Sequence, residues 1–331
     1  DFIGNSASAG GAIFNSDGTI GNITGDFIGN SSDGNGGAIY NHDSSRDPKS
    51  LVISDDSLEA MNNNAYSTVI GNITGNFIGN SAYEGGAIFN SDSAIGNVTG
   101  DFIANSARFA GGAICNEMGS IGNITGDFIG NSSRSRGGAI CNAYGSIGDI
   151  TGDFIGNSAS EGGAIYNFDR AEVDESLSAS DDSLEVMNNN AFNTVIGNIT
   201  GDFIGNRADA GGAIFNSDSA IGNITGDFIG NSANGAGAIF NRDGAIGNIT
   251  GDFVGNSGSY VGGAIYNSEG AIGNITGDFI GNRTSRDGGA IYNEYGAIIG
   301  DIAGDFIGNS AKSCGGAIYN GGTIGDITGS F

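Results

Sequence analysis

The sequence predicts an all-β fold, a right-handed parallel β-helix (β-solenoid), and three observations support this prediction. The chain consists of eleven similar units, nine of which are 25 to 27 residues long, and a fixed period of this size is typical of repeat architectures. Each unit contains three short stretches rich in Ile and Thr, separated by Gly, Asn, Asp and Ser, which indicates strands and turns. No helical periodicity runs through the units. The units begin at Asp1, Asp26, Asn76, Asp101, Asp127, Asp153, Asp202, Asp227, Asp252, Asp278 and Asp305.

The three strands expected in each unit are typified by the strings GGAIFN, TIGNIT and GDFIGN. A unit of about 25 residues is too short for a propeller blade and contains no solenoid helix, but it fits one rung of a parallel β-helix. Each strand then pairs with its copy in the next unit at about 4.8 Å, and right-handed winding is the default for parallel crossovers. We therefore expect three short strands per rung and about 11–13 rungs, which gives a rod of roughly 50–60 Å.

Two units are longer than the others because they contain inserts, at residues 42–69 and 168–195. Both inserts contain the string SDDSLE(A/V)MNNNA(Y/F), which indicates that a block holding one insert was duplicated as a whole. Two interpretations stay open. Each insert is either a protruding excursion with a short helical turn, at Asp56–Glu59 and Asp182–Glu185, or an extra degenerate rung, since its length is close to one unit.

We expect residues 1–331 to form a single repeat array that is a segment of a longer chain, because the sequence starts flush with a unit and Phe331 begins a twelfth one. The composition, with 64 Gly, one Pro and no Trp, fits an elongated extracellular protein. The net charge of −26 argues against nucleic acid or an anionic membrane as a partner, because both bind clustered Lys and Arg. No apolar run approaches the roughly 18 residues of a membrane span, so a secretion signal and an anchor are expected outside this segment.

Side-chain alternation along a strand predicts which columns of residues are buried. Ile13 and Asn15 share one face of the GGAIFN strand, and Phe14 lies on the other. Position 13 is Ile in every unit, whereas position 14 varies among Phe, Tyr and Cys, so we place Ile13 and its copies inside. The same alternation puts Ile3 with Asn5, opposite Phe2. The residues on both of these faces are nearly the same in all units, so variation does not indicate which face is buried, and the direction of Phe2 stays open.

Two asparagine columns are predicted to form hydrogen-bonded ladders along the stack. Asn5 and Asn15 recur in all eleven units, and stacked amides can donate to one another while also fixing their own turns. A buried Asn without such partners would cost on the order of 1–3 kcal/mol. The ladder residues singled out are Asn5, Asn15, Asn30, Asn41, Asn116, Asn142 and Asn167.

The motifs of the unit resemble those of a known family. Phe2 and Asn5 form an F-x-x-N motif, and Gly10–Ile13 form a G-G-A-I motif. Together they resemble the repeat of the chlamydial polymorphic outer-membrane proteins and of related autotransporter passengers. The resemblance covers the whole chain apart from the inserts. It implies a surface-exposed β-helix implicated in adhesion.

Carboxylates recur at the first position of ten units, within about 5 Å of one another. We interpret them as acceptors of backbone N–H groups at solvated turns. The alternative is Ca²⁺ bridging between rungs, with Asp101, Asp127 and Asp153 as candidate ligands; no other cofactor is expected. Catalysis by these carboxylates is disfavoured, because glycosidases need a unique cluster and a repeated column offers none.

Cys115 and Cys141 occupy one column in neighbouring units, at a separation that a disulfide tolerates. They are a candidate disulfide, but in-register parallel strands do not offer ideal Cβ directions, so stacked reduced thiols are favoured. Three cysteines in the chain do not form a disulfide framework.

Sequence variation is concentrated in the loop that follows each FIGN string and in the two inserts. Loops on a rigid scaffold are where recognition usually lies, although drift at solvent-exposed turns explains the variation equally well. The candidate recognition residues in these loops are Arg108, Phe109, Arg134, Arg136 and Arg286.

We therefore predict a structural and adhesive segment, without enzymatic activity, of a secreted or surface-anchored bacterial fibre. Its expected location is extracellular or on the cell surface. Its expected partners are further copies along the fibre axis and host or surface glycans or proteins, with no nucleic acid and no insertion into a membrane. The alternative function is a carbohydrate-active β-helix enzyme of the polysaccharide lyase or glycosidase type.

Overall fold

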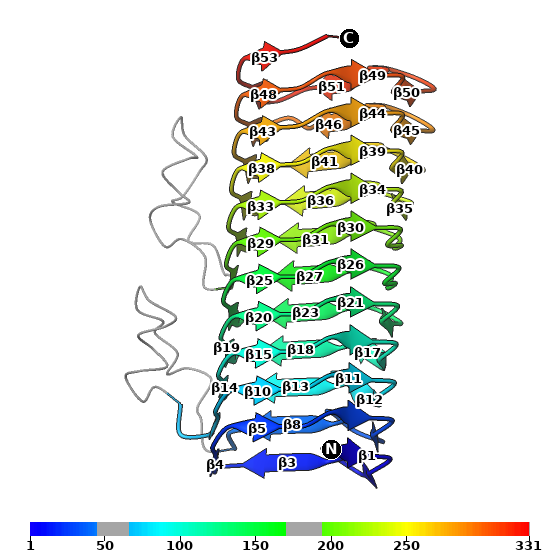
Figure 1. The fold of residues 1–331 in the computed structure, drawn as a ribbon. Helices are drawn as coiled ribbons and strands as arrows, with labels where there is room; N and C mark the ends of the chain where they lie inside the picture. Colours follow the sequence, from blue (N-terminus) through cyan, green and yellow to red (C-terminus); the bar gives the residue numbers. More distant parts are fainter. Residues whose placement is uncertain (45–65, 170–193, 331) are drawn as a thin grey trace.

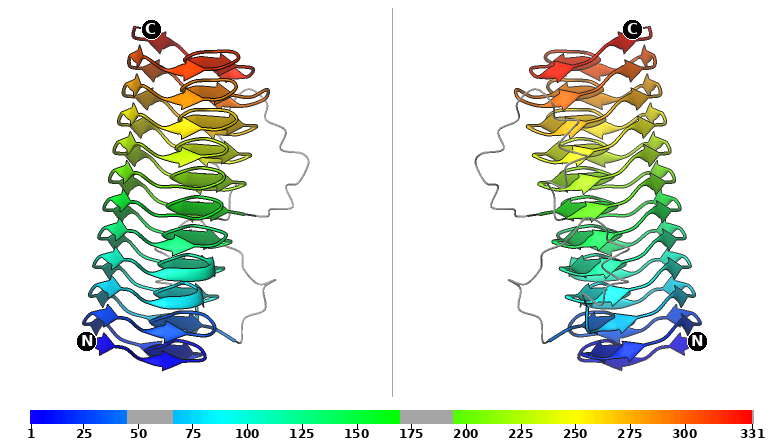
Figure 2. Two further views of the ribbon diagram at one scale, coloured as in Figure 1. Left: turned by 90° about the vertical axis from the view of Figure 1, so that its right-hand side faces the viewer. Right: turned by 90° about the vertical axis from the view of Figure 1, so that its left-hand side faces the viewer.

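A computed structural model describes residues 1–44, 66–169 and 194–330, and in this part of the chain all regular structure consists of short β-strands. The strands form a β-solenoid whose turns lie flat on one another, with the two termini at opposite ends (Figure 1, Figure 2). Four of its sheets contain eleven strands each, so the solenoid has eleven turns. The pairings between successive turns are parallel and join equivalent residues, as in Phe2 with Phe27. An exception is a register shift between β12 (Ser81–Glu84) and β17 (Ser106–Ala110), where Glu84 pairs with Ala110. The predicted parallel β-solenoid is confirmed.

The sheet formed by the FIGN strings, here the Phe sheet, supplies the aromatic part of the core. Its Phe side chains point inward, and Phe102 and Phe128 stack with ring centroids 4.7 Å apart and planes within 2°. The strands are β1 (Phe2–Ile3), β6 (Phe27–Ile28), β11 (Phe77–Ile78), β16 (Phe102–Ile103), β21 (Phe128–Ile129), β26 (Phe154–Ile155), β30 (Phe203–Ile204), β34 (Phe228–Ile229), β39 (Phe253–Val254), β44 (Phe279–Ile280) and β49 (Phe306–Ile307).

Alternation along the FIGN string fails at its glycine. Phe27 and Asn30 are both fully buried, although alternation places them on opposite faces, while Ile28 is partly exposed. The reason is Gly29, whose φ of +60° lies in the left-handed region that glycine adopts without strain. At this glycine the alternation of side chains between the two faces is interrupted, so that the asparagine points inward like the phenylalanine. The expectation that Ile3 and Asn5 share a face is therefore wrong.

The GGAIFN strings form a second sheet, here the Asn sheet, which buries Ile on its inner side as predicted. A glycine pair precedes ten of these eleven strands, and Ala236–Gly237 takes its place before Ile239. The two glycines are needed for different reasons: Gly36 has a φ of +66°, and a Cβ on Gly37 would lie 2.0 Å from the carbonyl oxygen of Gly86. The strands are β3 (Ile13–Ser16), β8 (Ile39–His42), β13 (Ile88–Ser91), β18 (Ile114–Glu117), β23 (Ile140–Ala143), β27 (Ile165–Phe168), β31 (Ile214–Ser217), β36 (Ile239–Arg242), β41 (Ile265–Ser268), β46 (Ile291–Asn293) and β51 (Ile318–Asn320).

The TIGNIT string, predicted as one strand, is two strands in two sheets. The bend at Gly21 and Asn22 turns both Ile side chains inward, so that Ile70 and Ile73 of the second turn are fully buried. Each turn therefore has four regular strands and not three. One sheet comprises β4 (Thr19–Ile20), β9 (Val69–Ile70), β14 (Ala94–Ile95), β19 (Ser120–Ile121), β24 (Ser146–Ile147), β28 (Val195–Ile196), β32 (Ala220–Ile221), β37 (Ala245–Ile246), β42 (Ala271–Ile272), β47 (Ile298–Ile299) and β52 (Thr323–Ile324). The other comprises β5 (Ile23–Thr24), β10 (Ile73–Thr74), β15 (Val98–Thr99), β20 (Ile124–Thr125), β25 (Ile150–Thr151), β29 (Ile199–Thr200), β33 (Ile224–Thr225), β38 (Ile249–Thr250), β43 (Ile275–Thr276), β48 (Ile302–Ala303) and β53 (Ile327–Thr328).

A fifth set of short strands, here the Ser ladder, follows each FIGN string and is interrupted. Between its two parts only single bridges connect the turns, such as Ser132 with Ser158 and Ser158 with Arg207. The five-stranded part comprises β2 (Ser6–Ala7), β7 (Ser31–Ser32), β12 (Ser81–Glu84), β17 (Ser106–Ala110) and β22 (Ser132–Ser133). The four-stranded part comprises β35 (Ser232–Ala233), β40 (Ser257–Gly258), β45 (Arg283–Thr284) and β50 (Ser310–Ala311).

The inserts interrupt a turn without adding one to these sheets. Strand β8 pairs with β3 and β13, and β9, which follows the first insert, pairs with β4 and β14. The strands on either side of the insert therefore belong to one turn. The predicted helical turns at Asp56–Glu59 and Asp182–Glu185 lie outside the described residues.

The two predicted asparagine ladders are confirmed. They differ in the backbone groups to which their side chains hydrogen-bond, in addition to the neighbouring asparagines. In the column of Asn5, the Nδ2 of Asn131 donates to Asn157 Oδ1 (3.1 Å) and to the carbonyl oxygen of Phe102 (2.8 Å). Its Oδ1 accepts both the backbone N–H (2.9 Å) and the Nδ2 (3.1 Å) of Asn105. All the polar atoms of this buried side chain are thereby paired, as burial requires.

In the column of Asn15, each amide ties down the turn that follows its strand. Asn142 Nδ2 donates to Asn167 Oδ1 (2.9 Å) and to the carbonyl oxygen of Gly145 (3.0 Å), while its Oδ1 accepts from Asn116 Nδ2 (2.8 Å). The ladder residues Asn5, Asn15, Asn30 and Asn41 make the equivalent bonds in the first two turns.

Candidate functional site

The column of aspartates serves the turns between strands. The backbone N–H of Asp153 donates to Asp127 Oδ1 at 2.9 Å, and that of Asp127 donates to Asp101 Oδ1 at 3.0 Å. This pattern repeats along the stack and agrees with our interpretation of these carboxylates as backbone acceptors. Within residues 1–44, 66–169 and 194–330, no group of three His, Cys, Asp or Glu residues is arranged to hold a metal ion. Calcium bridging at Asp101, Asp127 and Asp153 stays a prediction.

Cys115 and Cys141 are direct neighbours in adjacent strands of the Asn sheet, and both are buried. The structure has them as free thiols, so the candidate disulfide is not formed in it. A hydrogen bond with Cys141, together with burial, raises the pKa of Cys115 well above its ordinary value. Cys115 is therefore a protonated thiol, and it packs as a small hydrophobic side chain.

These thiols belong to a small apolar cluster on the outer side of the Asn sheet, here the outer cluster. Its buried members are Phe89, Ala110, Cys115, Cys141, Tyr166 and Phe215. The same column is exposed in the first turn, where Phe14 is 52% exposed. In the middle turns Phe109 and Ala110, at the end of the Ser-ladder strand β17, pack against the outward side chains and help to bury them.

Arg136 and Phe109, both predicted as recognition residues, pack on this cluster. The guanidinium carbon of Arg136 lies 5.3 Å from the ring centre of Tyr166 and 5.6 Å from that of Phe109. Its Nε lies 3.9 Å from Glu161 Oε2. These distances fit cation–π contacts, so the two side chains contribute to the cover of the outer cluster.

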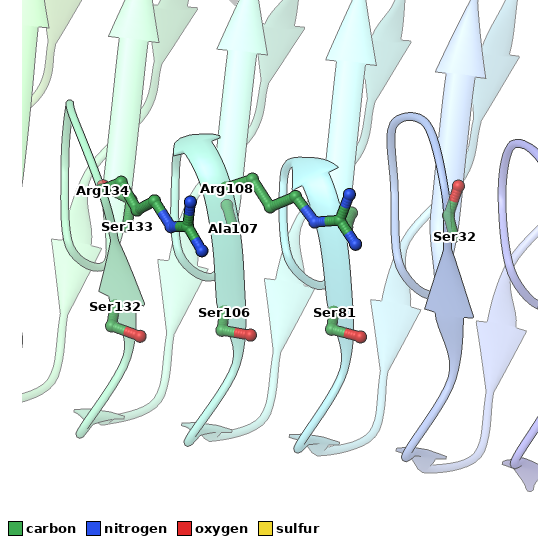
Figure 3. Close-up of a pocket in the computed structure, with 9 residues that line it drawn as sticks. Ser32, Ser81, Ser106, Ala107, Arg108, Ser132, Ser133 and Arg134 are labelled. Carbon is green, nitrogen blue, oxygen red and sulfur yellow. The ribbon is translucent and has the colours of Figure 1, made fainter.

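Arg108 and Arg134 are exposed, in contrast, and their side chains extend in the same direction from neighbouring turns, beside the hydroxyls of Ser81, Ser106 and Ser132 (Figure 3). They line a hollow of about 470 Å³ on the Ser ladder. Neither arginine has an ion pair or a hydrogen bond from its guanidinium to another described residue. Arg286 is also exposed, but it does not line this hollow.

A second hollow of about 530 Å³ continues the first along the axis and shares Ser133 and Arg134 with it. It is lined further by Arg207, Asp209 and Asn234. We call the two hollows together the Ser/Arg groove. The sequence analysis did not single out Arg207 or the serines as site residues. The sequence did contain a signal for them, because the residue directly after the asparagine of each FIGN-type string is always Ser or Arg. That residue is Ser6, Ser31, Ser81, Ser106, Ser132, Ser158, Ser232, Ser257 and Ser310, with Arg207 and Arg283 in the other two turns.

Two partly buried glutamates lie near the outer cluster. Burial raises the pKa of Glu84, and burial together with the neighbouring charge of Asp92 raises that of Glu117. Glu84 accepts a hydrogen bond from Asn35 Nδ2 at 3.1 Å. The neighbouring charge of Glu117 also raises the pKa of Glu84.

Comparison with known protein families found one match. The Chlamydia polymorphic membrane protein repeat matches the chain at five places, residues 25–42, 126–143, 152–167, 277–294 and 304–321. Each match spans one F-x-x-N motif and the G-G-A-I motif that follows it. These five segments are similar to that repeat, which confirms the resemblance seen in the sequence.

No curated protein and no solved structure matches the chain. In the described part of the chain, no helix is long and apolar enough to cross a membrane.

Proposed function

We propose that this chain is a rigid, non-enzymatic segment of a secreted or surface-anchored bacterial protein, which holds variable loops away from the cell for adhesion. The observation that carries the proposal is the set of five matches to the Chlamydia polymorphic membrane protein repeat. They fall in turns that continue into one another without a break in the four main sheets. A repeat of a surface protein family on an uninterrupted solenoid fits a structural role at the cell surface.

The geometry supports rigidity. Each turn is joined to the next by four strand pairings, two asparagine ladders and a stack of Phe rings. Because all of these repeat at each turn, bending the rod would have to strain several columns at once. Such a scaffold can hold loops at fixed positions along its length.

The alternative, a carbohydrate-active enzyme, finds less support. Glycoside hydrolysis uses a specific pair of carboxyl groups that flank the scissile bond. Here the carboxylates of the Asp column accept backbone N–H groups in the same way at successive turns. Incubation with acidic polysaccharides, followed by measurement of chain length and of unsaturated ends, tests this alternative. Shortened polysaccharide would overturn the proposed non-enzymatic role.

The adhesive part of the proposal can be tested with beads that carry the purified chain. Coated beads should bind to epithelial cells more than beads coated with an unrelated acidic protein of similar net charge. Equal binding of the two bead types would contradict adhesion and leave a purely structural role.

Association of copies along the axis is a second proposed property. It is supported by the register, since equivalent residues pair at each junction between described turns, as in Ile140 with Ile165 and Phe203 with Phe228. A junction between two copies can therefore use the same pairing as a junction within one. Sedimentation and electron microscopy should reveal end-to-end rods at micromolar concentration; a monodisperse monomer would contradict this property.

A further inference from the structure

The Ser/Arg groove is lined by three exposed arginines and by only one acid, Asp209, among the described residues. Arg108, Arg134 and Arg207 line it and have no ion pair with a described residue. The full chain has 37 acidic and 11 basic residues. Three unpaired arginines along one groove are therefore a marked departure from the composition of the chain.

The groove follows the axis of the solenoid and so fits an extended ligand. Arg108 and Arg134 lie in consecutive turns, and Arg207 lies two turns further on. Successive turns are about 4.8 Å apart, as the spacing of Phe128 and Phe154 shows. The guanidinium groups are thus distributed along several turns, which suits a linear polymer with spaced anionic groups better than a single compact anion.

The remaining lining indicates a polymer rich in hydroxyl groups. Ten lining residues are serines, and the hydroxyls of Ser81, Ser106 and Ser132 make no hydrogen bond to another described residue. A serine hydroxyl can both donate and accept, so a row of them can match the hydroxyls of a sugar chain. Arginine supplies the planar donors that bind carboxylates in pairs.

A nucleic acid fits the groove less well. Proteins that bind single strands stack the bases on aromatic side chains, and no aromatic residue lines the two hollows. A charge on each nucleotide would also be opposed by the net charge of −26. A polymer with few carboxylates avoids most of this repulsion. Its carboxylates can lie at the arginines, and acidic side chains of the protein more than about 8 Å away from them are screened at physiological salt.

We infer that the Ser/Arg groove binds an acidic polysaccharide of low charge density, with one carboxylate held between Arg108 and Arg134, another on Arg207, and its hydroxyls on the serines. This inference deepens the proposed adhesive function and rests on it for its biological meaning. The site itself can be tested with the purified chain alone.

The test uses fluorescent hyaluronan oligosaccharides, which carry one carboxylate per disaccharide, with neutral dextran and a single-stranded DNA oligonucleotide for comparison. The full chain should bind hyaluronan, with an affinity that falls as salt is added, and should not bind dextran. Arg134→Gln, which changes the arginine shared by both hollows, should weaken binding about ten-fold, the effect of losing one charge-assisted hydrogen bond. The double variant Arg108→Gln/Arg134→Gln should weaken it further.

The matched control is Arg286→Gln, which removes the same charge from an exposed loop that does not line the groove. Its affinity should equal that of the unchanged chain. Absence of hyaluronan binding, equal weakening by Arg134→Gln and Arg286→Gln, or preferential binding of the DNA oligonucleotide would each overturn the inference. Circular dichroism of each variant verifies that the fold is retained.

Bead adhesion to cells separates the failure of this site from the failure of the proposed function. If beads coated with Arg108→Gln/Arg134→Gln adhere as well as unchanged beads, adhesion holds and the groove is not its site. If unchanged beads do not adhere although the chain binds hyaluronan through Arg134, the site holds and the proposed adhesive function fails.

Discussion

The Phe sheet and the Ser ladder follow one another directly in each turn, yet they repeat to very different degrees. The Phe sheet is continuous over eleven strands and has Phe at its first position in all of them. The Ser ladder is split into parts of five and four strands, and its first residue changes between Ser and Arg. Only two residues separate the two regions, as Gly130 and Asn131 do in the fifth turn; in the fourth turn Ala104 takes the place of the glycine, with a φ of +53°.

The difference lies in what each side chain contacts. An inward Phe or Asn packs on or hydrogen-bonds to its own copy one turn away, so a change at one turn leaves two neighbours without a partner. A residue of the Ser ladder faces solvent on its outer side, where water replaces a lost partner. In these two regions, uniformity therefore accompanies side chains that contact their own copies one turn away, and variation accompanies the surface that is free to bind ligands.

The largest effect is expected for Phe128→Ala in the Phe sheet. The ring of Phe128 is fully buried between those of Phe102 and Phe154, so its removal leaves a cavity that costs about 3–5 kcal/mol. Urea unfolding followed by circular dichroism measures the loss. Ile129→Ala, on the partly exposed side of the same strand, is the control and should cost clearly less; a reversed order would contradict the assignment of the two faces.

A smaller but clear loss is expected for Asn142→Leu in the Asn sheet. The substitution removes the acceptor of Asn116 Nδ2 and the donor to Asn167 Oδ1, which are both buried. The free energy of unfolding should fall by on the order of 1–3 kcal/mol. An unchanged melting point would mean that this column does not need its partners.

The smallest effect is expected for Glu117→Gln beside the outer cluster. Burial raises the pKa of Glu117 in the folded chain, so ionisation at neutral pH opposes folding and this penalty is absent once the carboxyl is protonated. The variant should be more stable at pH 7 by less than about 1 kcal/mol, since the side chain is partly exposed. The advantage should vanish as the pH falls below the ordinary range of a glutamate.

Melting curves from about pH 3 to about pH 8, on both sides of the ordinary glutamate pKa, measure this difference. Glu269→Gln, at an exposed position of a later turn, is the control and should leave the melting point nearly unchanged at both ends of the range. A constant advantage of Glu117→Gln at all pH values would contradict the role of its ionisation.

The sequence was sufficient to predict the stacking of turns, the inward Ile of the Asn sheet and the two asparagine ladders. These features follow from columns of identical residues, whose register is fixed by the period. The direction of Phe2 could not be predicted, because the left-handed conformation of Gly29 and its equivalents breaks the alternation on which the argument depends. The TIGNIT string was predicted as one strand, although the spacing of three between Ile20 and Ile23 already indicated that a bend at Gly21 and Asn22 would be needed to bury both; the structure has this bend, and it divides the string into two strands.

The candidate site was predicted only in part. Arg108 and Arg134 were singled out by sequence variation, and the structure places them in the Ser/Arg groove. Arg136 and Phe109 were singled out in the same way, but they pack on the outer cluster. The difference depends on how far each loop folds back over the Asn sheet. This is a property of three-dimensional packing, and variation between units does not report it.

The most direct test compares two neighbouring residues, Asn131 and Ser132, by equilibrium urea unfolding. Asn131→Leu removes four hydrogen bonds of the buried ladder, to Asn105, Asn157 and Phe102, and should cost about 3 kcal/mol or more. Ser132→Ala, one position further on in the Ser ladder, should change stability by no more than about 0.5 kcal/mol. Similar losses for both variants would contradict the account, because the interior and the binding face would then depend equally on repetition.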